Sequence, residues 1–423
     1  MPSFSSIFIA AFILTFGLKL WLALRQMRHV WQYRGSVPPA FAGNISLEQH
    51  QKAADYTLAK GRLSLLNLVL EGGLLLLFTL GGGLQWLQDR AAGLTASPIW
   101  QGTLLLLGLM FVASAAELPL SLYRQFVIEA RFGFNRQTLA GFFADLVKQG
   151  LLALAIGIPL ILLTLWLMGR MGAEWWLWVW LMWMTFNLLV LAIYPTFIAP
   201  IFNKFTPLED ASLRSRIERL LDRAGFRASG VFVMDGSKRS SHGNAYFTGL
   251  GQSKRIVFFD TLLEQLDADQ TEAVLAHELG HYKHRHVLKR IVLMFVFSLV
   301  LLLGLAWLKD AGWFYAGLHV ASRTDATALA LFFLVLPVFL FPVTPLMSLY
   351  SRLHEFEADA FAARQSRPEF LVSALVKLYR DNASTLTPDP IHSIFYDSHP
   401  RAAERIARLQ TLADVPPQPI GAQ

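Results

Sequence analysis

The sequence predicts an all-α integral membrane protein that has seven transmembrane helices and a small cytoplasmic α+β insert. Three observations set this class. Of the 423 residues, 54% are hydrophobic and only 16% are charged, whereas a soluble protein carries roughly a quarter charged residues. Seven apolar stretches also approach or exceed the ~20 residues that a helix needs to cross a bilayer. Between the fifth and the sixth stretch, the chain becomes polar and is patterned like a small globular domain.

Each of the seven stretches is read as one transmembrane helix. The first could be mistaken for a signal peptide, but no basic residue precedes it, and Lys19 and Trp21 fit poorly with a small-residue cleavage site. We therefore expect it to be retained. The predicted spans are Phe4–Leu24, Leu63–Leu87, Ile99–Tyr123, Leu151–Met168, Trp175–Phe197, Ile291–Leu308 and Ala328–Tyr350.

Basic residues predict the orientation, because cytoplasmic loops carry an excess of Lys and Arg. The loops after the first, third and fifth spans are rich in both residues. The loops on the other side hold only Arg90, Arg170, Lys309 and Arg323. We therefore expect the N-terminus outside and the C-terminus in the cytoplasm. The net charge is +7, and the basic residues gather in loops beside the membrane. Such loops suit anionic lipid headgroups better than nucleic acid, so no nucleic-acid partner is expected.

Three ionisable residues fall inside predicted spans: Lys19, Glu71 and Glu117. Charges at this depth are costly, and they usually face the interior of a helix bundle or a water-filled cavity. Two interpretations stay open on these residues alone. They form internal ion pairs or polar packing, or they line an aqueous chamber.

The polar insert predicts a helix followed by a small sheet. Pro207 to Gly225 is typical of an amphipathic helix, with Gly225 as its stop. Short segments rich in Val, Ile, Phe and Tyr then predict strands, and a Gly-containing turn at Gly251–Ser253 would join the last two into a hairpin. The predicted strands are Gly230–Met234, Ala245–Thr248 and Arg255–Phe259.

The next helix carries the strongest chemical motif. Asp267 and Gln270 have the spacing of a capping box that would open this helix. On it, His277 and His281 stand four residues apart, so both can reach one metal ion. Glu278 follows the first histidine and is placed to accept a proton from an activated water. Because the chain has no cysteine, any metal site must use His, Asp or Glu.

A catalytic zinc site needs a third protein ligand and an open position. His284 and His286 lack the spacing of a known three-histidine motif. We expect them to be solvated or to face headgroups, and a role for one of them as an extra ligand is the alternative. Glu355 stands just after the seventh span, and the hairpin of spans six and seven returns it to the side where the histidine pair lies. Asp359, one turn later, could accept the second ring proton of a ligand histidine. Glu357 is the competing acidic residue.

With these residues identified, the chain resembles the type 1 CAAX prenyl endopeptidases, seven-span zinc proteases that are also called a-factor-converting enzymes. The resemblance extends from the second inner loop to His399. The segments that carry it are Phe132–Thr138, Tyr194–Pro200, Phe202–Leu208, Ser237–His242, Asn244–Gly249, His277–His281 and Glu355–Asp359.

The resemblance implies one Zn²⁺ per chain, held by His277, His281 and Glu355. It implies that Glu278 is the general base of a gluzincin-type zinc metalloendopeptidase. It also implies that Asp359 does not bind the metal itself but orients one of the residues that do.

The resemblance assigns two further groups of residues. His399 and Arg405 are similar to the His and Arg of the family's C-terminal motif, and His399 would stabilise the tetrahedral oxyanion. The strand that carries Asn244, Ala245 and Tyr246 would hold an extended peptide substrate by main-chain hydrogen bonds. From the residues alone, an internal sheet strand is the alternative. The family's helices also surround a polar, water-filled chamber, which gives a context to the intramembrane charges.

These features divide the chain and suggest a function. The expected parts are residues 1–200 with five spans, 201–290 with the insert and zinc motif, 291–350 with two spans, 351–414 completing the site, and a disordered tail at 415–423. The expected function is a membrane-embedded, CAAX prenyl protease-like zinc metalloendopeptidase acting on a peptide or protein substrate, prenylated or membrane-associated. A quality-control protease without prenyl specificity is the alternative, and a seven-span transporter or receptor is less favoured. The compact chain and its short Pro-rich tail suggest a bacterial inner membrane.

Overall fold

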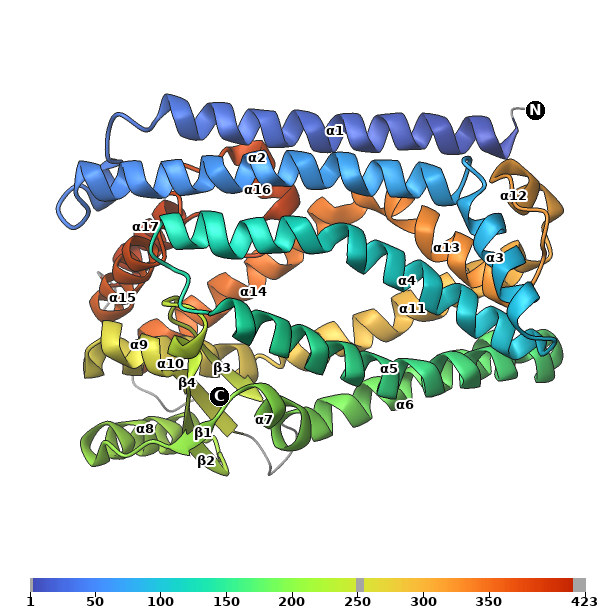
Figure 1. Ribbon diagram of the computed structural model, residues 1–423. Coiled ribbons are helices and arrows are strands. Elements are labelled where there is room, and N and C mark those ends of the chain that lie inside the picture. Colours follow the sequence, from blue (N-terminus) through green and yellow to red (C-terminus); the bar gives the residue numbers. More distant parts are fainter. Residues whose placement is uncertain (1–2, 249–254, 414–423) are drawn as a thin grey trace.

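The computed structural model describes residues 3–248 and 255–413. Long helices run side by side along one direction, and a small sheet lies with several shorter helices at one end (Figure 1). The N-terminus lies at the opposite end. The hairpin turn predicted at Gly251–Ser253 and the predicted tail at 415–423 both fall outside the described residues.

Seven helical segments are long and apolar enough to cross a membrane, which confirms the predicted integral membrane class. Neighbouring segments contact one another in the order in which they follow along the chain, and the seventh contacts the first; the seventh also contacts the third and the fourth across this ring. The helices that form them are α1 (Phe4–Gln32), α2 (Leu47–Phe78), α4 (Pro98–Tyr123), α5 (Leu139–Arg170), α6 (Trp175–Ile193), α11 (His286–Lys309), and α13 (Asp325–Leu340) with α14 (Thr344–Gln365).

The second predicted span is wrong at its end. Helix α2 stops at Phe78 instead of reaching Leu87, and the chain turns back into α3 (Gly83–Leu94). A run of three glycines allows this turn: Gly82 has φ of 74°, and a Cβ on Gly83 would lie 2.8 Å from the carbonyl oxygen of Leu77. Only glycine fits such positions without strain. The apolar residues after the turn therefore belong to a separate short helix.

The third, fifth and seventh spans do not end where the apolar residues end. Helix α4 continues into a π-helical segment, η2 (Arg124–Glu129), and α6 continues through η4 (Tyr194–Ile198) into α7 (Ala199–Phe202). A 3₁₀ turn, η7 (Phe341–Val343), interrupts the seventh span, as expected near proline. Helix α14 then extends well past the predicted end of that span, which leaves the acidic cluster on a regular helix.

The insert contains a four-stranded sheet in the order β1-β2-β4-β3. Strands β2 and β4 are parallel, and the two outer strands pair antiparallel to them. The bounds of β2 (Gly230–Met234), β3 (Ala245–Thr248) and β4 (Arg255–Phe259) agree with the predicted strands. The sequence did not predict β1 (Phe205–Pro207). Within the described residues, β3 is an edge strand of this sheet. The alternative that this segment is an internal sheet strand is therefore wrong.

Helices cover the sheet and form a core with it. The predicted amphipathic helix is α8 (Ala211–Ala224), which ends at Gly225 with φ of 65°. Helix α10 (Ala268–Lys283) opens with the predicted capping box. Leu220 of α8, Phe258 of β4 and Leu275 of α10 lie in one buried cluster. The remaining helices are α9 (Asp260–Gln265), α12 (Gly312–Gly317), α15 (Pro368–Asp381), α16 (Pro390–Tyr396) and α17 (Ala402–Ala413).

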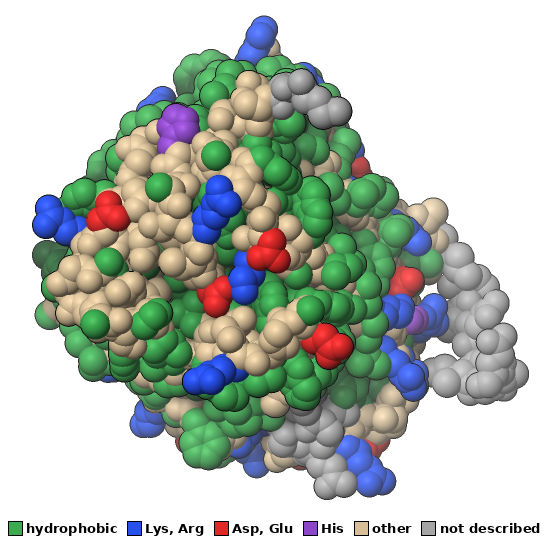
Figure 2. Space-filling model, turned by 90° about the vertical axis from the view of Figure 1, so that its right-hand side faces the viewer, with side chains coloured by type: hydrophobic (Ala, Val, Ile, Leu, Met, Phe, Trp, Pro, Cys, Tyr) green, Lys and Arg blue, Asp and Glu red, His purple; other side chains and the backbone are tan. Residues whose placement is uncertain are grey.

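The three intramembrane ionisable side chains form no ion pair among the described residues. Lys19 Nζ lies 5.2 Å from the centre of the Phe341 ring, and Glu71 accepts a hydrogen bond of 2.6 Å from Asn67. Glu117 lines a cavity of about 200 Å³. Figure 2 views the bundle from the end that carries α3 and α12, where hydrophobic side chains make up much of the face and charged ones are scattered between them.

Candidate metal centre

Helices α10 and α14 bring the predicted ligands together. His281 Nε2 lies 3.3 Å from His277 Nε2 and 3.2 Å from Glu355 Oε1, and His277 Nε2 lies 3.5 Å from Glu355 Oε2. Three donor atoms at such separations can share one ion at zinc's usual bond lengths of about 2.0–2.3 Å. Glu355 Oε2 is also buried without a hydrogen-bond partner. The geometry and the donor set therefore fit a zinc ion.

Close backbone packing explains why the two helices meet at this point. A Cβ on Gly280 would lie 2.8 Å from the Cα of Ala358 and 3.0 Å from its carbonyl oxygen. The glycine inside the His-Glu-x-x-His motif thus faces an alanine between Glu355 and Asp359. This contact sets the distance between the histidine pair and the acidic residues.

Asp359 lies behind His277, as the sequence predicted. Its Oδ1 is 2.8 Å from His277 Nδ1, and the Arg405 guanidinium donates two hydrogen bonds, of 2.8 Å and 2.6 Å, to its carboxylate. Burial lowers the pKa of His277, but hydrogen bonds to Asp359 and Glu355 more than offset burial and raise that pKa to about 9. The carboxylates therefore favour a positive charge at this imidazole, and the same field favours a bound cation.

Glu278 lies beside the ligand group on α10. Burial raises the pKa of Glu278, and the neighbouring imidazoles His277 and His281 oppose that rise. A carboxylate with a raised pKa suits a residue that accepts a proton and then returns it. The environment of Glu278 therefore fits a general base.

The C-terminal segment reaches the ligand group from a third direction. His399 Nε2 lies 3.5 Å from Glu355 Oε2, and 60% of the His399 side chain is exposed. Arg405 is instead buried on α17, with Nη1 3.8 Å from the same oxygen. His399 is thus free to meet a substrate, whereas Arg405 is committed to the acidic residues.

Strand β3 lies beside α10 and offers its outer edge. The main-chain oxygen of Asn244 accepts a hydrogen bond of 2.9 Å from Phe259, so Tyr246 directs its main-chain groups toward β4 and Ala245 directs its own outward. The Asn244 side chain accepts from the Ala245 N–H at 2.8 Å. Tyr246 lines a small cavity on the sheet with Pro195. A peptide that paired with the main chain at this edge would therefore take over the Ala245 N–H from Asn244.

Two residues near the centre have positions that the sequence did not predict, although Glu357 was considered as the competing acidic residue. His286 was expected to be solvated, but only 2% of its side chain is exposed, and its Nδ1 lies 2.9 Å from His281 Nδ1. Glu357 lies on the far side of His286, with Oε2 2.7 Å from Nε2. Helical spacing could not reveal the first contact, because five positions do not share a helix face. Arg285, with φ of 56°, breaks the helix and turns His286 back.

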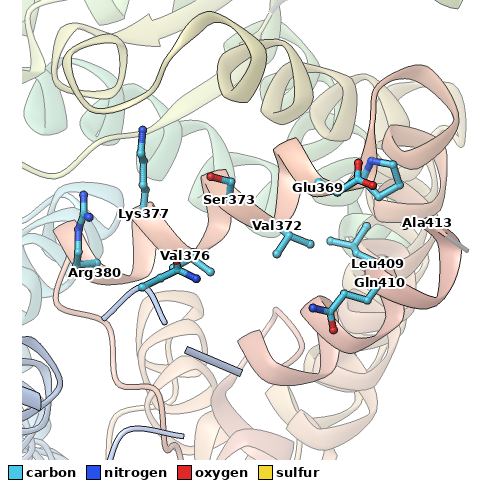
Figure 3. A pocket seen from close by; sticks show the side chains of 11 residues that line it. Glu369, Val372, Ser373, Val376, Lys377, Arg380, Leu409, Gln410 and Ala413 are labelled. Atoms are coloured by element: carbon cyan, nitrogen blue, oxygen red, sulfur yellow. The ribbon is translucent and has the colours of Figure 1, made fainter. Parts of the chain in front are cut away.

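Two cavities lie at the end of the molecule that carries the sheet and the shorter helices. One of about 510 Å³ is lined by His281 of the ligand group and by Phe247 of β3. Another of about 270 Å³ lies between α15 and α17, where Val372 and Leu409 give it apolar walls (Figure 3). None of the residues lining the second cavity was a predicted site residue.

Comparison with known proteins decides what this centre belongs to. Residues 26–204 match the family model "CAAX prenyl protease N-terminal, five membrane helices", and residues 207–413 match "Peptidase family M48". The chain belongs to peptidase family M48. As a family member it is a membrane zinc metalloprotease, which confirms the predicted resemblance and excludes a transporter or receptor.

Its relatives in family M48 cover nearly the whole chain. The CAAX prenyl protease 1 of Saccharomyces cerevisiae is 35% identical over 95% of this chain and 94% of its own length. The human CAAX prenyl protease 1 homolog is 34% identical over 97% of each chain. The crystal structure of S. mikatae Ste24p matches with a TM-score of 0.90 at 32% identity, over 97% of this chain and 99% of that one. These relatives favour the prenyl protease interpretation over the quality-control alternative.

Proposed function

We propose that this M48 protease binds one Zn²⁺ through His277, His281 and Glu355 and cleaves the C-terminal region of prenylated, CAAX-type proteins. The observation that carries the proposal is the ligand group itself, three donor atoms brought together by α10 and α14. The substrate class is supported by the names of the relatives and by the membrane location of the chain.

Bound zinc supplies a Lewis acid, which polarises the scissile carbonyl and lowers the pKa of water. Glu278 takes the proton from the attacking water and delivers it to the leaving amine. His399 donates to the oxyanion from its solvent-exposed position near Glu355. Arg405 holds Asp359, and Asp359 holds His277 in the orientation that presents Nε2 to the ion.

Strand β3 positions the substrate. Its outward main-chain groups pair with an extended peptide, and Asn244, Ala245 and Tyr246 form the receiving segment. Pairing along this strand lays the peptide beside α10, so the carbonyl to be cleaved faces the ligand group. Recognition by the main chain tolerates different side chains in the substrate.

The transmembrane ring serves the same reaction. We infer that it encloses a polar chamber lined by Lys19, Glu71 and Glu117. The ring-like order of helix contacts and the cavity that Glu117 lines support this inference. The basic loops support a cytoplasmic location for the catalytic part, which comprises the insert at 201–290 and the segment at 351–414. A bacterial inner membrane is the proposed location.

The test uses the full chain in detergent. Zinc content is measured first, and cleavage of a farnesylated CAAX peptide and its unprenylated counterpart is then compared for wild type and Glu278→Gln. We expect one zinc per chain, a strong preference for the farnesylated peptide, and loss of cleavage with zinc retained in the variant. Metal-free wild type would reject the zinc site, and equal cleavage of both peptides would reject the prenyl specificity.

A further inference from the structure

The second ring nitrogen of His281 is the starting point. His281 directs Nε2 toward His277 and Glu355, so Nδ1 points away from the ligand group. That atom lies 2.9 Å from His286 Nδ1, and His286 Nε2 lies 2.7 Å from Glu357 Oε2. We propose that His286 and Glu357 form a hydrogen-bond relay that fixes the tautomer and ring orientation of His281. The proposal rests on the zinc site described under the proposed function.

The positions of the ring protons determine the direction in which the relay donates. A neutral imidazole carries one ring proton. If His281 presents Nε2 to the ion, its proton is on Nδ1 and is donated to Nδ1 of His286. His286 then carries its own proton on Nε2 and donates it to the carboxylate of Glu357. Each donor meets an acceptor, and a carboxylate that is not itself a ligand ends the relay.

The position of Glu357 explains why an imidazole is needed between it and the ligand. Residues two positions apart lie about 200° around a helix, so Glu357 points away from the face of α14 that carries Glu355. Asp359 shares the face of Glu355 and reaches His277 directly. Glu357 reaches the other ligand only through His286. Both ligand histidines are therefore supported by a carboxylate of α14, one directly and one through an intervening ring.

Packing fixes His286 in the relay. Its ring lies parallel to the His354 ring, at 6°, with centroids 3.8 Å apart. His286 is the first residue of α11, directly after the turn at Arg285. In contrast, 46% of the Glu357 side chain is exposed, so the end of the relay meets solvent. A change at Glu357 therefore alters the relay with little cost to the core.

The competing interpretation is a second cation site. Donor atoms of His286, His354 and Glu357 all lie within 4.8 Å of one another. Two facts oppose it. The parallel rings cannot both direct an in-plane nitrogen lone pair at one ion. An ion on His286 Nε2 would also move the ring proton to Nδ1, where it would face the proton of His281.

The experiment measures the rate at which purified, zinc-loaded protein releases its metal to a chelator. Glu357→Ala and His286→Phe remove an acceptor, and we expect release to be about 10- to 100-fold faster, the usual range for losing such a partner. Glu357→Gln keeps a carbonyl oxygen as acceptor, and we expect it to restore most of the wild-type rate. His354→Phe is the control, because residue 354 is not part of the relay and a phenylalanine ring can still stack on His286. We expect this variant to release zinc at the wild-type rate.

The outcomes separate the proposals. Unchanged release in both Glu357→Ala and His286→Phe overturns the relay. A second zinc equivalent in wild type that is lost in His354→Phe overturns it in favour of the cation site. Wild type that binds no zinc rejects the proposed function instead. If the metal-free variants unfold at the same temperature as wild type, a folding defect is not the cause of faster release. If His286→Phe does not fold, Glu357→Ala still tests the relay, because Glu357 is exposed.

Discussion

Gly280 and Ala358 are in backbone contact, and this contact joins the two helices that carry the predicted metal ligands. The Cβ that any other residue would add at Gly280 lies 2.8 Å from the Cα of Ala358. The motif's glycine is thus needed for the approach of α10 to α14, independently of the chemistry of its neighbours.

Replacing Gly280 with alanine should separate the helices. Overpacking of this kind costs about 1–3 kcal/mol, and we expect zinc content to fall with stability. Metal analysis and thermal unfolding check this. Gly304→Ala in α11 is the matched control, since its Cβ would meet nothing within 4 Å. Full zinc occupancy in Gly280→Ala would contradict the role of the contact.

Asp359→Ala should weaken both folding and metal binding. It leaves the buried Arg405 guanidinium without its main partner, and breaking a buried pair in this way costs about 3–5 kcal/mol. The double variant Asp359→Leu, Arg405→Met removes both charges. We expect it to regain much of the stability but not the zinc affinity, because His277 still lacks its acceptor. Equal recovery of both quantities would show that the pair serves folding alone.

His399→Ala should lower turnover without loss of metal. The side chain is exposed, so stability should change little. Loss of one donor to a developing oxyanion typically lowers kcat by about 10²–10³. Peptide cleavage and zinc content measured on the same preparation test this, and a variant with wild-type kcat would remove His399 from the reaction.

Ala245→Pro should weaken substrate binding. It deletes the Ala245 N–H, which faces away from β4, is held by the Asn244 side chain in the free protein and would pass to a bound peptide. One main-chain hydrogen bond contributes about 1 kcal/mol, so KM should rise severalfold, up to about tenfold. Steady-state kinetics with thermal unfolding as the folding check measures this. An unchanged KM would show that peptides do not pair at this strand.

Patterns that depend on local physics were predictable from the sequence. Hydropathy located the seven spans, and segments rich in Val, Ile, Phe and Tyr located β2, β3 and β4. Glu355 was found because the hairpin of the last two spans restricts where its helix can return. Each of these sequence signals depends on a single helix or strand, or on a single connection between two of them.

Features set by tertiary contact were missed. The turn at Gly82 lies inside an apolar run, so hydropathy alone extended α2 too far. Strand β1 has only three residues and is defined by its pairing with β2. The contact between His281 and His286 depends on the backbone reversal at Arg285, for which arginine gives no signal.

The continuity of the seventh span with α14 has a consequence for how this protein can be divided. The helix that holds Glu355 and Asp359 begins at a turn that follows directly from the membrane-crossing part of α13. The metal centre is therefore not a portable module attached to an anchor. A water-soluble fragment taken from the insert would keep the histidine pair and lose Glu355. The proposed catalytic apparatus therefore includes a helix that continues directly from a membrane-crossing segment.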